Sequence, residues 1–429
     1  MLTYIMKRVV FFVILVVFLF LIPLIVANNP DISFASPTPS NGTTQAGDSI
    51  YVNLSTIDSS GHDHYSFVDF NSDLVFWMRM DVFNGTDVLG ESSYGNNGTL
   101  INNTYINESG YWGNASWFDG GGDYIKFGDE DELIGSNYTY SFWIHYINET
   151  LTSQQGIFTK FDATTEDGVD ITTLSTSNRI RIFLDDGTTP ALDSDNEFLI
   201  PNTWLHVAFV LNGTNVSLYR NGVLNKSSNL VFSGNVTGTD TDVFLGWENN
   251  AADRYLNGSL DDFIIFNRTL TATEISALYN ASSNQYERNF TELSASDHAF
   301  TGYAVDVAGN KNETEERTIT INANLDTTNP DISFVSPTPS NGTLQQGSTI
   351  YVNVSSSDVD DNGNTVDHYS FIDFDDSLKL WMRFDDMNNA TEVMDLSQYG
   401  SNGTLMGNVT VNSTGYWGNA SHHPDETGS

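Results

Sequence analysis

The sequence predicts an all-β protein made of antiparallel sandwiches. Runs of alternating polar and apolar residues, rich in Val, Ile, Phe, Tyr and Thr, recur along the chain and are separated by Asn-Gly, Asp-Gly or Gly-Gly turns. Asn221-Gly222, between two such runs, is typical of a two-residue hairpin. Beyond the apolar N-terminus, the one good helix pattern covers residues 271–279, with Thr273 as the expected N-cap. Many short strands with frequent turns indicate a β-sandwich or a jelly roll.

A long-range repeat organises the chain. Residues 29–43 return almost unchanged at 329–343, and the similarity continues to residues 110–116, which reappear at 415–421. A solenoid unit has roughly 20 to 50 residues, far fewer than this period, so a whole domain assembly repeats. We expect residues 325–429 to hold only the first part of a second unit.

Acidic residues dominate the charged side chains. The chain has 55 Asp and Glu against 16 Lys and Arg, a formal net charge of −39, although only 17% of its residues are charged. A surface of this sign repels a phosphate backbone, which excludes nucleic acid as a partner, and it favours cations such as calcium. Because the chain contains no cysteine, disulfides and Cys-ligated metals are excluded.

The N-terminus has the pattern of an export signal. Lys7 and Arg8 precede an apolar run from Val9 to Val26. Residues 1–28 therefore predict a hydrophobic helix that is either a cleaved signal peptide or a retained membrane anchor. In both cases the positive flank stays inside, and the rest of the chain is extracellular or at the cell surface.

Glycosylation sequons are abundant. Of the 45 Asn residues, 25 stand in N-x-[ST] patterns, from Asn41 to Asn419. The Ser and Thr content would give only about nine by chance. We expect N-glycosylation, which adds solubility to an exported chain without disulfides. The alternative is a composition rich in polar, turn-forming residues.

Residues 74–281 contain seven stretches that follow the order of a known family. They are SDLVFWMRMD, YGNNGTL, WGNASWFDGGGDYIKF, YTYSFWIHY, TWLHVAFVLNGTNVSLYRNGVL, VFLG and NGSLDDFIIFNRTLTATEISALY. This part of the chain resembles the laminin-G-like (LamG-like) jelly roll, a concanavalin A-like fold. The resemblance implies two antiparallel sheets packed face to face, with Phe118, Trp143 and Trp204 in the core.

The segments on either side of this jelly roll resemble the two parts of one immunoglobulin-like (Ig-like) domain. Residues 29–73 supply opening strands, and residues 282–324 supply closing strands with the D-x-A-G-N turn of bacterial and archaeal Ig-like repeats. Neither segment has enough strands to close a core alone. We expect an Ig-like β-sandwich in which the jelly roll is inserted. The alternative is two separate linkers.

The catalytic pattern of hydrolases that share this fold is missing from the sequence. The resemblance implies that an enzyme would carry E-x-D-x-x-E along one strand, with alternate carboxylates facing the cleft. The nearest acidic run, residues 129–132, is consecutive and typical of a solvated turn. We therefore expect a non-catalytic protein that binds carbohydrate or a surface protein. The alternative is a secreted glycoside hydrolase or its carbohydrate-binding accessory part.

Five residues are candidates for ligand binding. Trp117 and Trp247 are expected to be exposed, so that a sugar ring can stack on them. The alternative for Trp117 is that it packs against the Ig-like flank. Asn249, Asn250 and Asp253 follow Trp247 closely and offer amide and carboxylate groups for the sugar hydroxyls.

The resemblance also implies a structural calcium ion at the edge of the sandwich. In relatives an Asp of the closing strand holds the ion; Asp261 matches that residue, and Asp262 stands beside it. Asp119 and Asp123 of the FDGGGD loop are expected to complete the ligand set, because hard oxygen ligands suit calcium. The alternative is that these residues cap turns or pair with arginines.

Overall fold

A computed structural model of the chain describes most of residues 29–422. The gaps are residues 60, 62, 148–153, 163–166, 175–177, 187–190, 231–240, 250–252, 281–284, 323–325, 327, 361–364, 413–414 and 416–418. Residues 1–28, on which the predicted hydrophobic helix falls, lie outside the described part. No helix among the described residues is long and apolar enough to cross a membrane. The chain divides into two compact units, Met1–Leu325 and Asp326–Ser429.

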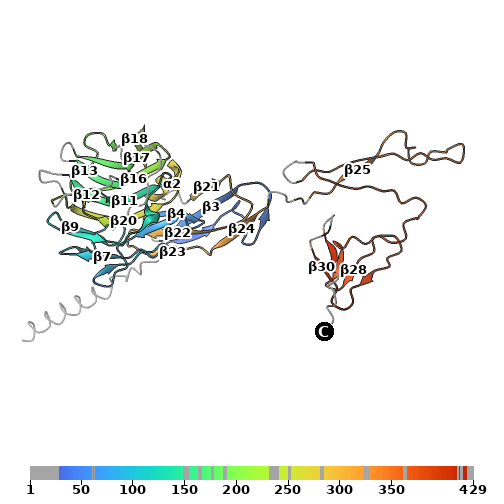
Figure 1. Cartoon of the computed structure of the whole chain (residues 1–429), viewed down its shortest axis with the longest axis horizontal. Helices are drawn as coiled ribbons and strands as arrows, with labels where there is room; N and C mark the ends of the chain where they lie inside the picture. Colours follow the sequence, from blue (N-terminus) through green and yellow to red (C-terminus); the bar gives the residue numbers. More distant parts are fainter. Residues whose placement is uncertain are drawn as a thin grey trace, which may run out of the picture. The chain divides into compact units, whose positions relative to one another are not determined.

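The first unit contains a jelly roll of two antiparallel sheets (Figure 1). Sheet I has the strand order β15 (Ala191–Asp193), β14 (Arg179–Asp186), β13 (Asp167–Leu174), β12 (Gln155–Asp162), β19 (Phe244–Leu245), β10 (Tyr124–Lys126), β7 (Gly98–Ile101), β6 (Asp87–Val88). Sheet II has the order β18 (Val223–Asn229), β17 (Asn215–Arg220), β16 (Trp204–Asn212), β11 (Thr139–Tyr146), β20 (Asn257–Phe266), β9 (Ala115–Asp119), β8 (Tyr105–Asn107), with β5 (Leu74–Met78) also paired to β20. The predicted all-β class is confirmed.

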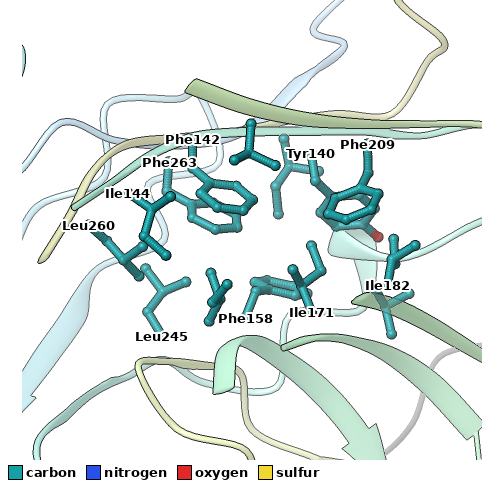
Figure 2. Packing of buried hydrophobic residues seen from close by; sticks show 14 of the residues in the cluster. Tyr140, Phe142, Ile144, Phe158, Ile171, Ile182, Phe209, Leu245, Leu260 and Phe263 are labelled. Carbon is teal, nitrogen blue, oxygen red and sulfur yellow. The ribbon is translucent and has the colours of Figure 1, made fainter. Parts of the chain in front are cut away.

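The core of the jelly roll lies between sheets I and II (Figure 2). Side chains alternate along β11, so that Phe142 and Ile144 enter this core whereas Trp143 lies on the opposite face. The rings of Phe142 and Phe263 stack with 5.0 Å between their centroids, and Phe158 from sheet I lies 5.5 Å from Phe263. Each such side chain stabilises the fold by about 1.5–3 kcal/mol through its removal from water.

Strands from both sides of the jelly roll form a smaller sandwich. One sheet consists of β1 (Asp31–Phe34), β3 (Ile50–Ile57) and β21 (Gln285–Phe290). The other consists of β2 (Thr44–Gln45), β24 (Arg317–Ile321), β22 (Asp297–Asp306) and β23 (Lys311–Glu313), with β4 (His64–Phe70) paired to β22. Their apolar faces meet around Phe70, whose ring lies 3.8 Å from that of Phe290 and 5.8 Å from that of Phe300.

The single α-helix in the described residues, α2 (Ala272–Tyr279), packs where the two sandwiches meet; a 3-10 helix, η1, covers Asp131–Leu133. Its N-cap is Thr271, not Thr273 as the sequence predicted. The Thr271 hydroxyl accepts the N–H of Glu274, and the Glu274 carboxylate accepts the N–H of Thr271. This reciprocal capping box requires Glu or Gln three residues after the cap, and Ser276 stands at that position relative to Thr273.

Glu274 also ties the helix to its surroundings. Its buried carboxylate pairs with Arg268 at 2.8 Å and with Arg288, and Arg268 pairs in turn with Asp73. Burial alone raises the pKa of Glu274, but the charges of Arg268 and Arg288 bring it below its ordinary value. The ionised side chain therefore connects the end of sheet II to β21 through Arg288 and, through Arg268 and Asp73, to the turn after β4.

The joint between the two sandwiches is an apolar cluster on the outer side of sheet II. We call this set of side chains the joint cluster; its members include Tyr65, Phe67, Trp77, Trp112, Trp143, Ile264, Phe266, Ile275, Leu278 and Val305. Trp143 is thus buried as expected, but in the joint and not between the sheets. Trp204 is only half-buried at the margin of the joint cluster, whereas Phe118 lies in the jelly-roll core.

The second unit is made of short strands. They are β25 (Asp331–Phe334), β26 (Val354–Ser357), β27 (Met387–Asn389), β28 (Glu392–Val393), β29 (Gly403–Thr404), β30 (Thr410–Asn412) and β31 (Ala420–His422). They form the pairs β25–β26 and β30–β31 and the three-stranded sheet β27–β28–β29. Each of these sheets joins strands that follow one another in the sequence.

Candidate ligand-binding face

The two outer faces of the jelly roll differ in character. The joint cluster occupies the outer side of sheet II. On sheet I, residues next to core positions point outward and gather aromatic and charged groups. Loop residues between β19 and β20 lie against these side chains. We call the combined set the candidate face; it consists of Tyr124, Phe161, Asp170, Arg181, Phe183 and Phe244 of sheet I and Trp247, Glu248, Arg254 and Tyr255 of the loop.

Trp247 is the centre of the aromatic part of the candidate face. Its half-buried ring lies 5.0 Å from Tyr124, 5.0 Å from Phe244 and 5.6 Å from Tyr255, on which it stacks at 16°. Rings at these separations stabilise one another by about 0.5–1.5 kcal/mol per pair beyond their burial. Trp247 is therefore fixed in orientation while part of its ring stays accessible.

Backbone packing explains why the Trp247 loop lies against the sheet. Trp247 forms an isolated antiparallel bridge with Tyr255 just after β19. This loop crosses β12 at Gly156, where a Cβ atom would collide with the backbone of Trp247 and Glu248. Glycine at this position permits the close approach.

Charged groups lie beside the aromatic part. The Asp170 carboxylate of β13 is buried and accepts a hydrogen bond from Thr159 Oγ1 at 2.7 Å. Burial raises the pKa of Asp170 well above its ordinary value, the nearby charge of Glu248 raises it further, and Arg254 opposes both. Glu248 is also buried and forms an ion pair with Arg254, whose guanidinium is partly exposed. The candidate face therefore combines charged side chains that form hydrogen bonds with an aromatic surface.

The structure brings together only some of the sequence-predicted binding residues. Trp247, Asn249 and Asp253 lie on or beside the candidate face, and Asn249 Nδ2 donates to the Phe161 carbonyl at 3.1 Å. Asn250 lies outside the described residues.

Trp117 is separated from this group. It belongs to β9 in sheet II, where its neighbour Phe118 enters the jelly-roll core and its own ring lies 6.4 Å from Tyr105. Because neighbouring strand residues alternate, Trp117 points outward from sheet II. Trp117 and Trp247 are therefore on opposite layers and do not form one site.

Asp261 and Asp262 lie in the joint rather than at an edge of the sandwich. Asp261 Oδ2 accepts the N–H groups of Tyr111 at 2.7 Å and Trp112 at 2.9 Å. Asp262 Oδ1 accepts the Tyr65 hydroxyl at 2.6 Å. Both carboxyl groups are buried, so their hydrogen bonds hold the loop before β9 and the smaller sandwich against sheet II.

Asp119 and Asp123 are not close to that pair. Asp123 Oδ1 accepts the N–H of Asn103 at 2.9 Å, and its Oδ2 accepts that of Asp119 at 3.2 Å. Asp119 faces Asn257 across the strands, and Asn257 is four residues before Asp261, or about 13 Å along the strand. The four carboxylates therefore do not form one coordination shell. Over the described ranges, no group of three or more His, Asp or Glu is arranged to hold a metal ion.

The charged residues of the candidate face are not among the binding residues predicted from the sequence. Asp170 was detectable in principle, since it stands between Val169 and Ile171, which enter the core, and must therefore point outward. Glu248 and Arg254 belong to no regular pattern. They become neighbours of Asp170 only because β12, β13 and β19 are adjacent in sheet I.

Comparisons with known proteins identify the jelly roll. Residues 119–276 match a laminin G family model described as the Concanavalin A-like lectin/glucanases superfamily. A comparison with curated proteins found no match.

Part of the chain is similar to solved structures of low identity. The botulinum neurotoxin serotype D binding domain is 20% identical, with a TM-score of 0.41, over 49% of this chain and 52% of the toxin domain. Domain 4 of AbnA, a GH43 extracellular arabinanase from Geobacillus stearothermophilus, in complex with arabinotriose, is 20% identical, with a TM-score of 0.32, over 51% of this chain and 97% of that domain. Trypanosoma rangeli sialidase in complex with the inhibitor DANA is 16% identical, with a TM-score of 0.35, over 48% of this chain and 32% of the sialidase. The aligned region spans about half the length of the toxin domain.

The family match confirms the resemblance seen in the sequence: residues 119–276 form a laminin-G-like domain of the concanavalin A-like lectin/glucanase superfamily.

Proposed function

We propose that this is a non-catalytic extracellular protein whose jelly roll binds carbohydrate on the candidate face. The observation that carries the proposal is the half-buried Trp247 ring, held by three aromatic neighbours beside partly exposed arginine. A sugar offers C–H groups to such a ring and hydroxyls to charged and amide groups. Arg181, Arg254 and Asn249 are the polar groups that we assign to the hydroxyls.

A glycoside hydrolase, or an accessory part of one, is the second candidate. Asp170 and Glu248 are two neighbouring carboxyl groups on one face, and the raised pKa of Asp170 is a property of a general acid. Both carboxyl groups are buried, however. Thr159 donates a hydrogen bond to Asp170, and Arg254 forms an ion pair with Glu248. We therefore favour binding over hydrolysis, and we place a protein ligand third because the face has few apolar aliphatic groups.

A glycan and surface-polymer binding screen on the full chain tests the proposal. We expect selective binding that Trp247→Ala weakens about tenfold, which corresponds to about 1.4 kcal/mol of lost ring contact. Trp117→Ala is the matched control, because it removes a half-buried Trp from the other sheet. The proposal fails if no glycan binds or if both variants lose binding equally. Release of reducing sugar from a bound polymer would favour the hydrolase.

We also propose a domain organisation and a location. Residues 29–73 and 282–324 form one Ig-like domain, and residues 74–281 are inserted in it; the pairing of β3 with β21 and of β4 with β22 supports this division. Residues 325–429 begin a second such unit. Residues 1–28 direct export and act as signal peptide or membrane anchor, and the sequons carry sugar.

We also propose a calcium site, formed by Asp119 and Asp123 without Asp261 and Asp262. Burial raises the pKa of Asp123, and the charge of Asp119 adds to this effect. A cation between the two carboxylates would relieve their repulsion. Asp261 and Asp262 are assigned to the joint, where they accept backbone and side-chain donors.

A further inference from the structure

A small cavity lies in the joint between the two sandwiches. Its walls combine apolar side chains of the joint cluster with four polar residues, Tyr65, Ser141, His206 and Asp262. No more than 2% of the surface of any of these four is accessible. The cavity leaves about 10 Å³ for the centre of a water-sized sphere, which is the lower limit for one water molecule and too little for a larger ligand.

Two polar atoms of the residues in this wall have no hydrogen-bond partner among the described residues. They are Asp262 Oδ2 and His206 Nδ1. The other polar atoms of the same side chains are paired. Asp262 Oδ1 accepts the Tyr65 hydroxyl at 2.6 Å and the Trp77 Nε1–H at 3.3 Å, and His206 Nε2 lies 2.9 Å from Ser141 Oγ. Nearly all buried polar atoms in proteins are hydrogen-bonded, so we expect a partner for these two as well.

Serine, histidine and aspartate are also the residue types of a hydrolase triad. In a triad the serine must reach a substrate, but Ser141 is only 1% exposed in the joint. A triad also needs a hydrogen bond between the aspartate and the histidine, and Asp262 Oδ2 and His206 Nδ1 form none. The three residues therefore do not form an active site.

Asp262 and His206 are both predominantly neutral near pH 7. Burial raises the pKa of Asp262 to about 8, although the charge of Arg79 opposes this shift. Burial lowers the pKa of His206 to about 3. The pair therefore carries no charge for a metal ion to neutralise. Water suits the pair, because it can accept the proton of the acid and donate to the imidazole.

We propose that the cavity binds one water molecule, which bridges Asp262 Oδ2 and His206 Nδ1. Since Asp262 Oδ1 already accepts two donors, the acid proton belongs on Oδ2 and is donated to the water. The water in turn donates to His206 Nδ1. The imidazole proton is then on Nε2, which donates to Ser141 Oγ.

This water extends a line of hydrogen bonds across the joint. The line begins at Tyr65 of β4 in the smaller sandwich and reaches Asp262 of β20. Through the water it continues to His206 of β16 and Ser141 of β11. The water thus fixes the tautomer of His206 and the position of the Asp262 proton, and it connects β4 to two further strands of sheet II.

Oxygen-17 magnetic relaxation dispersion of the full chain, which counts long-lived bound water molecules, tests the proposal. We expect His206→Phe to hold one such water molecule fewer than the wild type, because Phe keeps a ring and removes Nδ1. Asp262→Asn should hold as many as the wild type, since the amide N–H replaces the acid proton as donor. The matched control is His145→Phe, which changes a half-buried histidine on the same face of sheet II and should also leave the number unchanged.

The tautomer of His206 gives an independent readout. In the full chain labelled with nitrogen-15 at histidine, we expect the His206 resonances near pH 7 to show a proton on Nε2 and none on Nδ1. A proton on Nδ1 would overturn the proposal, as would an unchanged number of bound water molecules in folded His206→Phe. If His206→Phe does not fold, electron density between Asp262 Oδ2 and His206 Nδ1 in a crystal of the wild type replaces the count, and its absence overturns the proposal.

Discussion

Asp262 lies in a bulge of β20, with a backbone φ of 42°, and its carboxyl group is buried in the joint between the two sandwiches. Tyr65 and Trp77 both donate to its Oδ1. Burial raises the pKa of Asp262 to about 8, against the opposing charge of Arg79. Near neutral pH the group is therefore mostly protonated, which suits an apolar joint and does not suit a calcium ligand.

This pKa predicts a pH dependence of stability. Because the folded-state pKa of Asp262 is above its ordinary value, the stability it contributes is complete below about pH 4 and is lost as the pH rises through about 8. We expect the free energy of unfolding, measured by urea denaturation, to fall more between about pH 5 and 8.5 in the wild type than in Asp262→Asn. Asp297→Asn, at an exposed carboxylate, controls for the general effect of net charge. Parallel curves for the wild type and Asp262→Asn would contradict the assignment.

At the scale of elements, α2 depends on its capping box. The helix has only eight residues, so it is too short to be stable without packing and capping. Ile275 and Leu278 supply the packing as members of the joint cluster, and Thr271 with Glu274 supplies the cap. The helix in turn covers part of the outer side of sheet II.

The position of the cap gives a direct test. We expect Thr271→Ala to lower the free energy of unfolding by about 1 kcal/mol, the usual loss for an N-cap threonine. Thr273→Ala is the matched control and should change stability by less than about 0.5 kcal/mol, because Thr273 is exposed within the helix. Urea denaturation of the two variants measures both values. A larger loss of unfolding free energy for Thr273→Ala than for Thr271→Ala would support Thr273 as the N-cap, as the sequence predicted.

At the scale of the whole molecule, the two units share sequence but differ in burial. β8 pairs with β9 in the first unit, and β30 pairs with β31 at the repeated positions of the second. The pairings of β3 with β21 and of β4 with β22 have no counterpart among the described residues of the second unit. Local pairings therefore form in both copies, and the long-range pairings bury the apolar residues only in the first.

Calcium binding is tested on the whole first unit by thermal melting. If Asp119 and Asp123 hold the ion, calcium at about one hundred times its dissociation constant stabilises the folded state by about 2.7 kcal/mol, which raises the melting midpoint by a few degrees. A chelator should reverse the rise, and Asp119→Asn should abolish it. Asp297→Asn should keep it. A midpoint that responds to neither calcium nor chelator removes the ion from the proposal.

The sequence by itself determined the all-β class and many local hairpins. At Asn221-Gly222 both residues have positive φ, 50° and 75°, and the hairpin joins β17 to β18 as expected. These features follow from period-two alternation and turn chemistry, which act over a few neighbouring residues. The family resemblance extended this information to the order of the strands.

Only the tertiary structure decided which of the candidate site residues are neighbours. It placed Trp117 and Trp247 on opposite layers, moved Asp261 and Asp262 into the joint, and added Asp170 to the candidate face. The physical reason is that adjacent strands in a jelly roll come from distant parts of the chain. Spacing along the sequence fixes which side of its own strand a residue occupies, but the strand order of the sheet fixes what that residue meets.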